Sequence, residues 1–470
     1  MSAAQRADTS NRRKNKKRRR TNDAGEPRPG LETRQCAHRL LSAIVDKSTP
    51  MDALTDDQHG HPSYLALAPR DRSLVRAILM AALRYRGDLE AVIDDYLERP
   101  LPDGALSLRA ILHVAAAQIF FLDVPAHSAV DLAVESANRD PRNRRFASLV
   151  NAVTRRMVRE KETRLDMFST TQSHGPFWFF DRLSAVYGRE SAERIFAIHR
   201  LPAPIDITLK SPTEGIAEAL LDGRSGKRLS DTNVRLTGKI DVTQLPGFTE
   251  GHWWVQDYAA SLPAKMFDEL DGRKVLDVCA APGGKTAQLL ARGARVTALE
   301  KSASRARRLE ENLRRIGLLD KCEIIVTDMF EYSPDKAFDG VLLDAPCSST
   351  GTVRRHPDVP WTKSSADIDK LAALQARMLD KAAEFVAPGG LLVFSNCSLD
   401  PSEGEEVANA FGNNSAPLFH IVPVKPGEYG LDAGMVDAQG FVRTTPAQLP
   451  DVDRALAGLD GFFAGRFRRR

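Results

Sequence analysis

The segment DVCAAPGGKT, residues 277–286, decides the fold of the larger part of this chain of 470 residues. An apolar stretch runs here into a glycine-rich turn and then into residues that favour a helix. A P-loop would need a glycine where Cys279 stands, and the dinucleotide fingerprint needs three spaced glycines where only Gly283 and Gly284 occur. The turn therefore predicts a close backbone approach to a smaller ligand at the N-terminus of a helix.

Short apolar stretches alternate with helical ones on both sides of this turn, from about residue 273 onward. This alternation predicts an α/β fold with a parallel, doubly wound sheet, in which ligands bind at the carboxyl ends of the strands. The predicted strands are KVLDVCA (274–280), RVTALE (295–300), CEIIVTD (322–328), FDGVLLDAP (338–346) and GLLVFSNCS (390–398).

Two of these strands end in a carboxylate that suits an adenosyl ligand. Glu300 follows Asp277 by 23 residues and is well placed to accept hydrogen bonds from both ribose hydroxyls. Asp328 ends the next strand, where it could bond an adenine amino group. An acid at a strand end is often only a helix N-cap. The glycine turn, Glu300 and Asp328 in series nevertheless predict an adenosyl ligand that lacks a pyrophosphate.

Two cysteines follow the ends of the last two strands, in DAPCSSTG (344–351) and SNCS (395–398). A lone cysteine is usually a small buried hydrophobe. If these strands are central and adjacent, however, Cys347 and Cys397 face one crevice beside the adenosyl ligand, which could then be a methyl donor. A thiolate that adds to carbon 6 of a cytosine makes carbon 5 nucleophilic, and Asp344 could stabilise the adduct at the N3 edge. The residues alone do not say which thiol attacks.

That chemistry sets two further expectations. A base must remove the carbon-5 proton before the thiolate leaves, and a second cysteine or a water could serve. The target base must be reached outside its stack, so single-stranded or flipped RNA is expected.

The cysteine pattern and the hydropathy of the chain indicate the cellular compartment in which the protein is expected. The five cysteines form no CxxC pair, which predicts a reducing, cytoplasmic setting with no disulfide framework and no metal site. The sequence has no run of about 18 apolar residues, so no membrane span is expected. The basic N-terminus lacks the apolar stretch of a secretory signal. The cysteines are Cys36, Cys279, Cys322, Cys347 and Cys397.

The charge is uneven along the chain. Residues 1–30 carry ten Lys or Arg and three Asp or Glu, whereas the remainder carries a net charge of −3. So basic a segment is expected to be disordered, and it would attract phosphate backbones without reading sequence. A solubilising tail or an import-like signal remains the alternative.

The remaining segments divide into two predicted domains. Apolar residues recur at helical spacing within 74–83, 111–120 and 146–157, so residues 31–170 are expected to be all-helical. Residues 171–255 mix aromatics, prolines and short β-like runs, which predicts a small connecting α+β domain.

The helical part resembles a known domain in VPAHSAVDLAVESAN (124–138) and FASLVNAVTRRM (146–157). Both stretches are similar to the NusB domain, which binds RNA and protein partners and is fused to the front of some ribosomal RNA methyltransferases. The resemblance implies an RNA-binding domain, although the basic residues could equally be a solvated helix face. Those residues are Arg142, Arg144, Arg145, Arg155 and Arg156.

The later motifs resemble the RNA 5-methylcytosine methyltransferases, in DVCAAPGGKT and in DAPCSSTG with VRRHPDVPW (353–361). With the NusB-like front, the chain is similar to the RsmB/Sun/Fmu-like ribosomal RNA small-subunit enzymes. VQDYAASLPAKM (255–266) and DGFFAGRFRRR (460–470) resemble the same family. The resemblance implies a Rossmann-like methyltransferase domain in 256–470, S-adenosylmethionine as cofactor, RNA as partner, and a monomer.

Residue by residue, the resemblance also implies roles. Glu300 takes the ribose, Asp328 the adenine, and Asp344 lies between cofactor and base. Cys397 is the nucleophile and Cys347 assists product release, although Asn396 stands where the family usually has threonine. The loop on the methionine side comprises Cys279, Ala280, Ala281, Pro282, Gly283, Gly284 and Lys285.

Three other readings stay open. A methyltransferase acting on protein or a small molecule would have no use for the pair of thiols. A binding factor with an inactive methyltransferase fold would not need the intact site residues. A transfer RNA substrate is disfavoured only by the likeness of the front domain.

Overall fold

The computed structural model describes residues 28–170, 175–212 and 215–470. The chain forms two compact units, of which the first ends at residue 174 and the second begins at Gly175. The predicted basic tail lies, through residue 27, outside the described residues.

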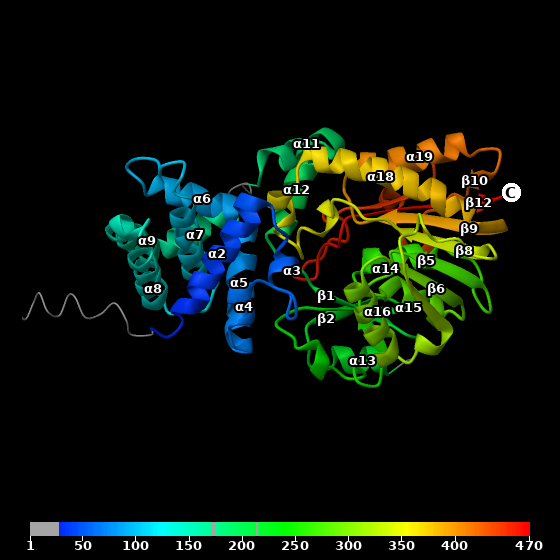
Figure 1. The fold of residues 1–470 in the computed structure, drawn as a ribbon, viewed down its shortest axis with the longest axis horizontal. Coiled ribbons are helices and arrows are strands. Elements are labelled where there is room, and N and C mark those ends of the chain that lie inside the picture. The colour runs from blue at the N-terminus through cyan, green and yellow to red at the C-terminus, as the bar shows by residue number, and fades with distance from the viewer. Residues whose placement is uncertain (1–27, 171–174, 213–214) are drawn as a thin grey trace, which may run out of the picture. The chain divides into compact units, whose positions relative to one another are not determined.

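The first unit is helical in all its described elements, as predicted. Helix α7 is buried nearly all round, and α2, α5, α8 and α9 pack against it (Figure 1). A helix that is apolar on every side belongs at the centre of a bundle. The helices are α2 (Leu31–Lys47), α3 (Met51–Leu54), α4 (Pro62–Leu65), α5 (Pro69–Arg84), α6 (Arg86–Asp95), α7 (Leu106–Phe121), α8 (Ala126–Arg139), α9 (Ala147–Arg159) and α10 (Lys161–Thr170).

The second unit begins with two helices and a small antiparallel sheet of strand order β2-β3-β1-β4. Trp253 is fully buried in the apolar cluster of this sheet. Arg235 and Asp206, both without exposed side-chain surface, form a two-pronged ion pair on neighbouring strands. The elements are α11 (Phe177–Tyr187), α12 (Arg189–His199), β1 (Ile205–Leu209), α13 (Ile216–Leu221), β2 (Gly226–Ser230), β3 (Asn233–Leu236) and β4 (Trp253–Val255).

The large sheet has the strand order β10-β12-β9-β8-β5-β6-β7, and β11 pairs with β12. The five predicted strands all form and are parallel, which confirms the doubly wound α/β fold. Three antiparallel strands from the C-terminal region extend the sheet beyond β9. The strands are β5 (Lys274–Val278), β6 (Arg295–Glu300), β7 (Cys322–Val326), β8 (Phe338–Asp344), β9 (Val386–Asn396), β10 (Phe419–Ile421), β11 (Val442–Thr444) and β12 (Phe462–Arg469).

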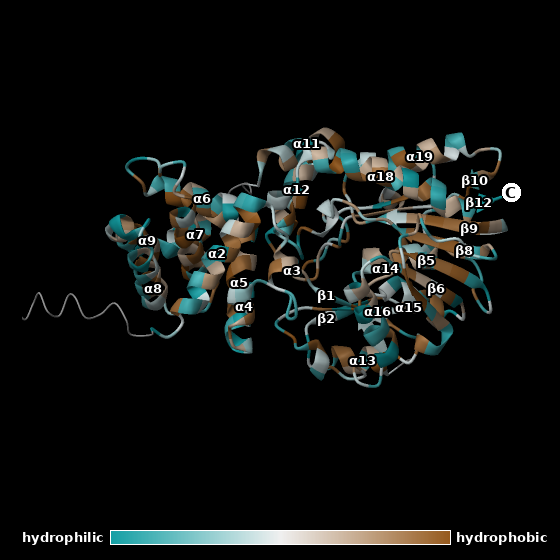
Figure 2. Cartoon of the chain, viewed as in Figure 1, coloured by the Kyte–Doolittle hydropathy of each residue, from teal (hydrophilic) through white to brown (hydrophobic). Residues whose placement is uncertain are grey.

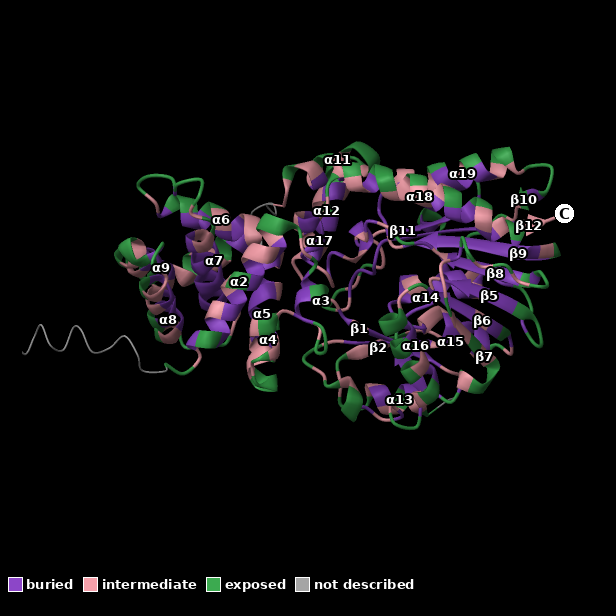
Figure 3. Ribbon diagram, viewed as in Figure 1, coloured by how far each residue is buried: buried purple, intermediate pink, exposed green. Residues whose placement is uncertain are grey.

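Helices cover both faces of this sheet (Figure 1). One face carries α14 (Tyr258–Lys265), α15 (Gly284–Ala291) and α16 (Ala303–Arg315), and the other carries α18 (Ser365–Glu384) and α19 (Glu405–Asn414). The strands between them are apolar along most of their length (Figure 2) and largely buried (Figure 3). Strands buried on both faces explain why the sequence showed continuous apolar runs rather than alternation.

Two negative findings concern the described residues only. None of their helices is both long enough and apolar enough to cross a membrane. Nor do they bring three His, Cys, Asp or Glu side chains into a cluster that could hold a metal ion.

Candidate active site

The glycine loop connects β5 to α15. Gly283 has φ +106°, and a Cβ on this residue would lie 2.6 Å from Leu309 Cδ1 on α16. The backbone conformation therefore favours glycine here. Helix α15 starts at Gly284, so its unpaired N-terminal amides belong to the same loop.

A cavity of about 630 Å³ opens at the carboxyl ends of the central strands. The whole predicted loop from Cys279 to Lys285 lines it, together with Asp277, Asp344 and Cys397. Its size falls in the range of small-molecule pockets, roughly 300–1,000 Å³. The fold thus brings the glycine loop and one of the two thiol segments to a single cavity. Neither Glu300 nor Asp328 is among the residues that line it.

The two cysteines meet at the ends of neighbouring strands. Strands β8 and β9 pair in parallel up to Asp344 opposite Ser395, and the Sγ atoms of Cys347 and Cys397 lie 3.5 Å apart. The hydrogen bond between the thiols raises the pKa of Cys347 and lowers the pKa of Cys397. The Cys397 Sγ also lies 3.6 Å from Ser349 Oγ, which lowers the same pKa further. The pair is arranged so that one thiol can ionise while the other keeps its proton.

Asp344 is held beside these thiols by two donors. Lys285 Nζ donates to its Oδ2 at 2.7 Å and Ser395 Oγ donates to its Oδ1 at 3.0 Å. The Lys285 ammonium also lies 4.8 Å from the ring centroid of Phe462, which lines the cavity too. The carboxylate is therefore fixed in orientation while about 30% of its side chain stays exposed.

Glu300 has a buried acceptor oxygen to which no described residue donates a hydrogen bond. The residue is 3% exposed, and its Oε1 accepts a hydrogen bond from Ser302 N at 2.9 Å. No described residue donates a hydrogen bond to its buried Oε2, although Arg305 Nη1 lies 3.4 Å away. A buried carboxylate oxygen without a donor is costly, and a ribose hydroxyl would relieve that cost.

Asp328 follows β7 by two residues and is already engaged. Its Oδ2 accepts a hydrogen bond from Lys301 Nζ at 2.8 Å, and its Oδ1 accepts one from Phe330 N at 3.0 Å. Each oxygen keeps one free lone pair, so an adenine amino group can still be bonded. With the amides of the loop and the open oxygen of Glu300, the residues present fit S-adenosylmethionine.

The cavity is also lined by an arginine and two aspartates that the sequence analysis did not predict as site residues. Arg355 Nη2 donates to Asp257 Oδ2 at 2.6 Å and Arg355 Nε donates to Asp460 Oδ2 at 3.0 Å, and all three residues line the cavity. Burial raises the pKa of Asp460 to about 7, against the attraction of Arg355. Arg355 and Asp460 are 105 residues apart, and nothing in the local pattern of either segment signals their contact.

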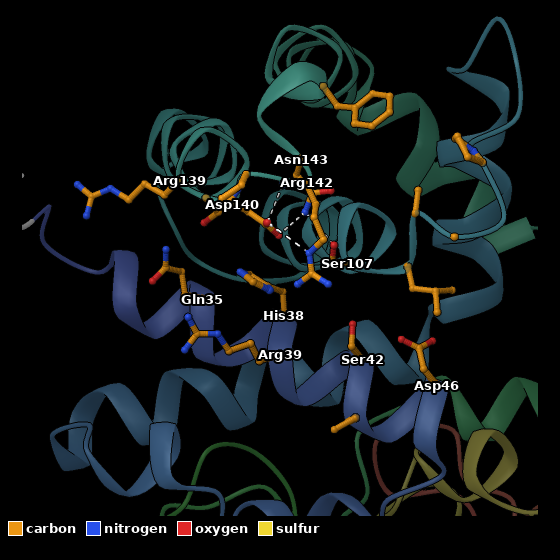
Figure 4. Close-up of a pocket in the computed structure, with 18 of the residues that line it drawn as sticks. Gln35, His38, Arg39, Ser42, Asp46, Ser107, Arg139, Asp140, Arg142 and Asn143 are labelled. Atoms are coloured by element: carbon orange, nitrogen blue, oxygen red, sulfur yellow. Dashed lines mark hydrogen bonds and ion pairs between the residues drawn. The ribbon is translucent and has the colours of Figure 1, made fainter. Parts of the chain in front are cut away.

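A larger cavity of about 1170 Å³ lies within the first unit (Figure 4). His38 and Arg39 of α2 face it across from Arg139 and Arg142, and Asp140 accepts hydrogen bonds there from Asn143 and from the backbone of Arg142. Burial lowers the pKa of His38 to about 4. None of the lining residues is a thiol, and the predicted glycine loop lines the smaller cavity instead.

Two family models match the chain, one in each unit. Residues 264–466 match the family of the 16S rRNA methyltransferase RsmB/F, and residues 31–159 match the NusB family. The second match confirms the NusB-like front domain.

Named relatives resemble most of the chain. Ribosomal RNA small subunit methyltransferase B of Xanthomonas campestris is 36% identical over 82% of this chain and 89% of its own length. The protein of that name from Xylella fastidiosa strain 9a5c is 37% identical over 92% of this chain and 98% of its own. The crystal structure of a protein named PH0851 superposes with a TM-score of 0.68 over 94% of this chain and 99% of that one, at 22% identity.

These likenesses extend over most of the chain. The chain belongs to the 16S rRNA methyltransferase RsmB/F family and is an S-adenosylmethionine-dependent RNA methyltransferase.

Proposed function

We propose that the protein methylates carbon 5 of a cytosine in RNA through a covalent adduct with Cys397. The observation that carries this proposal is the 3.5 Å separation of the Cys347 and Cys397 Sγ atoms beside Asp344. Methylation of an amine or an oxygen has no use for two thiols, because those atoms are already nucleophilic. Carbon 5 of cytosine is not, and it becomes so only after a thiolate adds to carbon 6.

The chain's own residues supply the steps around the transfer. The Cys397 thiolate bonds to carbon 6, and the electron pair displaced from the ring double bond makes carbon 5 nucleophilic. When bound, S-adenosylmethionine supplies the electrophilic methyl group that carbon 5 accepts. Asp344, oriented by Lys285, faces the N3 edge and stabilises the charge that develops on the ring. A water then takes the carbon-5 proton, and the electron pair of that bond re-forms the double bond between carbons 5 and 6 as the Cys397 thiolate leaves.

The surroundings of the two thiols support an assignment of their roles. Cys397 lines the cavity and carries the lowered pKa, which suits a nucleophile. Cys347 carries the raised pKa and remains a neutral thiol. We therefore assign attack to Cys397 and assistance in product release to Cys347.

We further propose small-subunit ribosomal RNA as the substrate, bound in part by residues 31–170. The support is the printed name of the relatives, ribosomal RNA small subunit methyltransferase B. We also propose that the protein acts as a monomer in the cytoplasm. Transfer RNA is the competing substrate.

A denaturing gel tests the covalent step. Wild type, Cys347→Ser and Cys397→Ser are expressed in cells, and the purified proteins are run with and without nuclease. We expect a slow, nuclease-sensitive band for Cys347→Ser alone, because that variant forms the adduct but releases it poorly. A band for Cys397→Ser alone would reverse the assignment, and no band for either would reject the covalent mechanism. Sequencing of the trapped RNA decides between ribosomal and transfer RNA.

A further inference from the structure

The two thiol loops are joined by one buried carboxylate, that of Glu403, which follows the second loop and is 0% exposed. Its Oε1 accepts hydrogen bonds from Ser348 N at 2.8 Å and Gln375 Nε2 at 3.0 Å. Its Oε2 accepts from the hydroxyls of Ser348 and Ser398. Ser348 follows Cys347 and Ser398 follows Cys397, so a single side chain bonds the residue after each thiol.

The residues before the thiols are held by the same group of side chains. Gln375 Nε2 also donates to the carbonyl oxygen of Pro346 at 3.0 Å. Asn396 Nδ2 donates to the carbonyl oxygen of Glu403 at 2.6 Å, and Asn396 Oδ1 accepts from Ser398 N at 3.0 Å. The residues on both sides of Cys347 and of Cys397 are thus tied, directly or through Gln375, to Glu403.

The charge of Glu403 affects the pKa of the neighbouring thiol of Cys347. Burial raises the pKa of Glu403, and the hydrogen bonds from Ser348 and Ser398 oppose that rise. The N–H groups of Ser348 and Gln375 can only donate, so they favour the ionised carboxylate. Its negative charge raises the pKa of Cys347, after the larger effects of the Cys397 hydrogen bond, of burial and of the Cys397 charge.

Other charged groups face these atoms from neighbouring elements. On the Cys397 side, Lys285 favours the thiolate and Asp344 opposes it. Next to Glu403, Asp400 repels the carboxylate, while Arg182 from α11 is attracted to it. Glu403 is thus one of the charges that weigh most on the pKa of Cys347, whereas Asp344 and Lys285 are the charges that weigh most on the pKa of Cys397.

We propose that Glu403 is a positioning residue for the methyl-transfer reaction: it fixes the distance between the two thiols and keeps Cys347 as the protonated partner of a Cys397 thiolate. The inference rests on the proposed covalent function, because it assigns the cause of the division of roles between the cysteines. It adds a residue that touches neither cofactor nor base and acts only through the two loops.

The test removes the charge while keeping the shape, with Glu403→Gln. Each cysteine is alkylated with iodoacetamide across a pH series, and its modification is quantified by peptide mass spectrometry. We expect the alkylation midpoint of Cys347 to fall by about one pH unit, because a nearby negative charge is lost. Iodoacetamide should then also modify Cys397 less selectively over Cys347. Methylation kcat drops roughly tenfold to a hundredfold, while KM for S-adenosylmethionine is unchanged.

The matched control is Glu406→Gln, the same substitution at an exposed position on α19. It should leave both the alkylation profile and kcat as in wild type. If Glu403→Gln fails to fold, Ser348→Ala removes one donor to the same carboxylate and should speed alkylation of Cys347 at a fixed pH. A folded Glu403→Gln with an unshifted Cys347 midpoint, whether active or not, would overturn the proposal and leave Glu403 a structural residue.

The readouts separate this inference from the proposed function. Alkylation needs neither RNA nor methyl transfer, so it reports on Glu403 even if no RNA adduct ever forms. Absence of an adduct in both cysteine variants rejects the covalent function, whereas an unshifted alkylation profile rejects only the role of Glu403.

Discussion

Lys285 Nζ lies 2.7 Å from Asp344 Oδ2, so the glycine loop after β5 is hydrogen-bonded to the residue that ends β8. The two side chains come from segments 59 residues apart. Their contact joins the loop that fits the methionine end of the cofactor to the carboxylate proposed to face the base. The side chain of Lys285 is only 12% exposed, so the pair is shielded from water more than a surface ion pair is.

Lys285→Met should therefore impair the chemical step more than cofactor binding. Methionine keeps an apolar stem but lacks the charge that orients Asp344. We expect kcat to fall by roughly a hundredfold, as when one donor to a developing charge is lost, with less than about a tenfold change in cofactor affinity. Tritium transfer to RNA and calorimetric titration of S-adenosylhomocysteine measure the two effects. Lys381→Met, at a lysine paired with Glu384 on α18, is the control, and an active Lys285→Met would contradict the role.

Glu300→Gln should instead impair cofactor binding more than the chemical step. Its buried Oε2 is the acceptor proposed for the ribose, and a hydrogen bond to a charged group contributes about 1.5–3 kcal/mol. The dissociation constant for S-adenosylhomocysteine should rise roughly tenfold to a hundredfold, while kcat at saturating cofactor changes little. Glu310→Gln on α16, whose carboxylate pairs with Arg314 near the surface, should bind as wild type does. Equal affinity in both variants would remove Glu300 from the cofactor site.

Much of the sheet was predictable because its strands are apolar and separated by helices. Strand β6 spans Arg295–Glu300 as predicted, and β5, β7 and β8 begin at the predicted residues. These three end two residues early, because a loop at the strand end carries the same residue types as the strand. Strand β9 starts at Val386 rather than at residue 390, since a chain segment rich in proline and glycine continues the strand past an irregularity in the β8 pairing.

The contacts that complete the site were not predictable from local pattern. Strand β12 is antiparallel and lies between β9 and β10, and no periodicity signals that insertion. Glu403 stands in a polar stretch that reads as an ordinary surface loop, yet it is fully buried between Ser348 and Ser398. Such residues are brought together by strand pairing across the sheet, whereas sequence periodicity reports only on neighbours along the chain.

Asp277 should make stability depend on pH. Burial raises its pKa to about 7, against a hydrogen bond from Thr286, and the nearby Asp344 adds to the rise. The folded state then holds a proton that the unfolded chain releases above about pH 4. Stability from this group is thus present at low pH and lost as pH rises from about 4 to 7.

Asp277→Asn removes that dependence, because the amide is neutral and its oxygen can still accept from Thr286. The melting temperature of the variant relative to wild type should be higher at pH 8 than at pH 4.5. The difference corresponds to about 2–4 kcal/mol at most. Asp320→Asn, at an exposed position before β7, should show no such change between the two pH values. A constant difference for Asp277→Asn would mean that its carboxyl group is ionised in the folded protein.

The basic surface of the first unit can be tested by salt dependence. Arg142 and Arg145 are exposed and line the larger cavity, and Arg142 makes only a loose ion pair of 3.6 Å with Asp140. If each contacts a phosphate, replacing both with alanine should lower RNA affinity at low salt. The slope of log affinity against log salt should then become shallower by about 1.4–1.8, because two fewer counterions are released.

The control for that experiment is the pair Arg189→Ala and Arg194→Ala, exposed arginines on α12 that each pair with a glutamate of the same helix. It removes the same net charge from the chain, so a general electrostatic effect would weaken RNA binding equally in both double variants. A loss of slope confined to Arg142 and Arg145 means that this surface contacts phosphates. An unchanged slope in both means that Arg142 and Arg145 do not contact phosphates and only solvate a helix face.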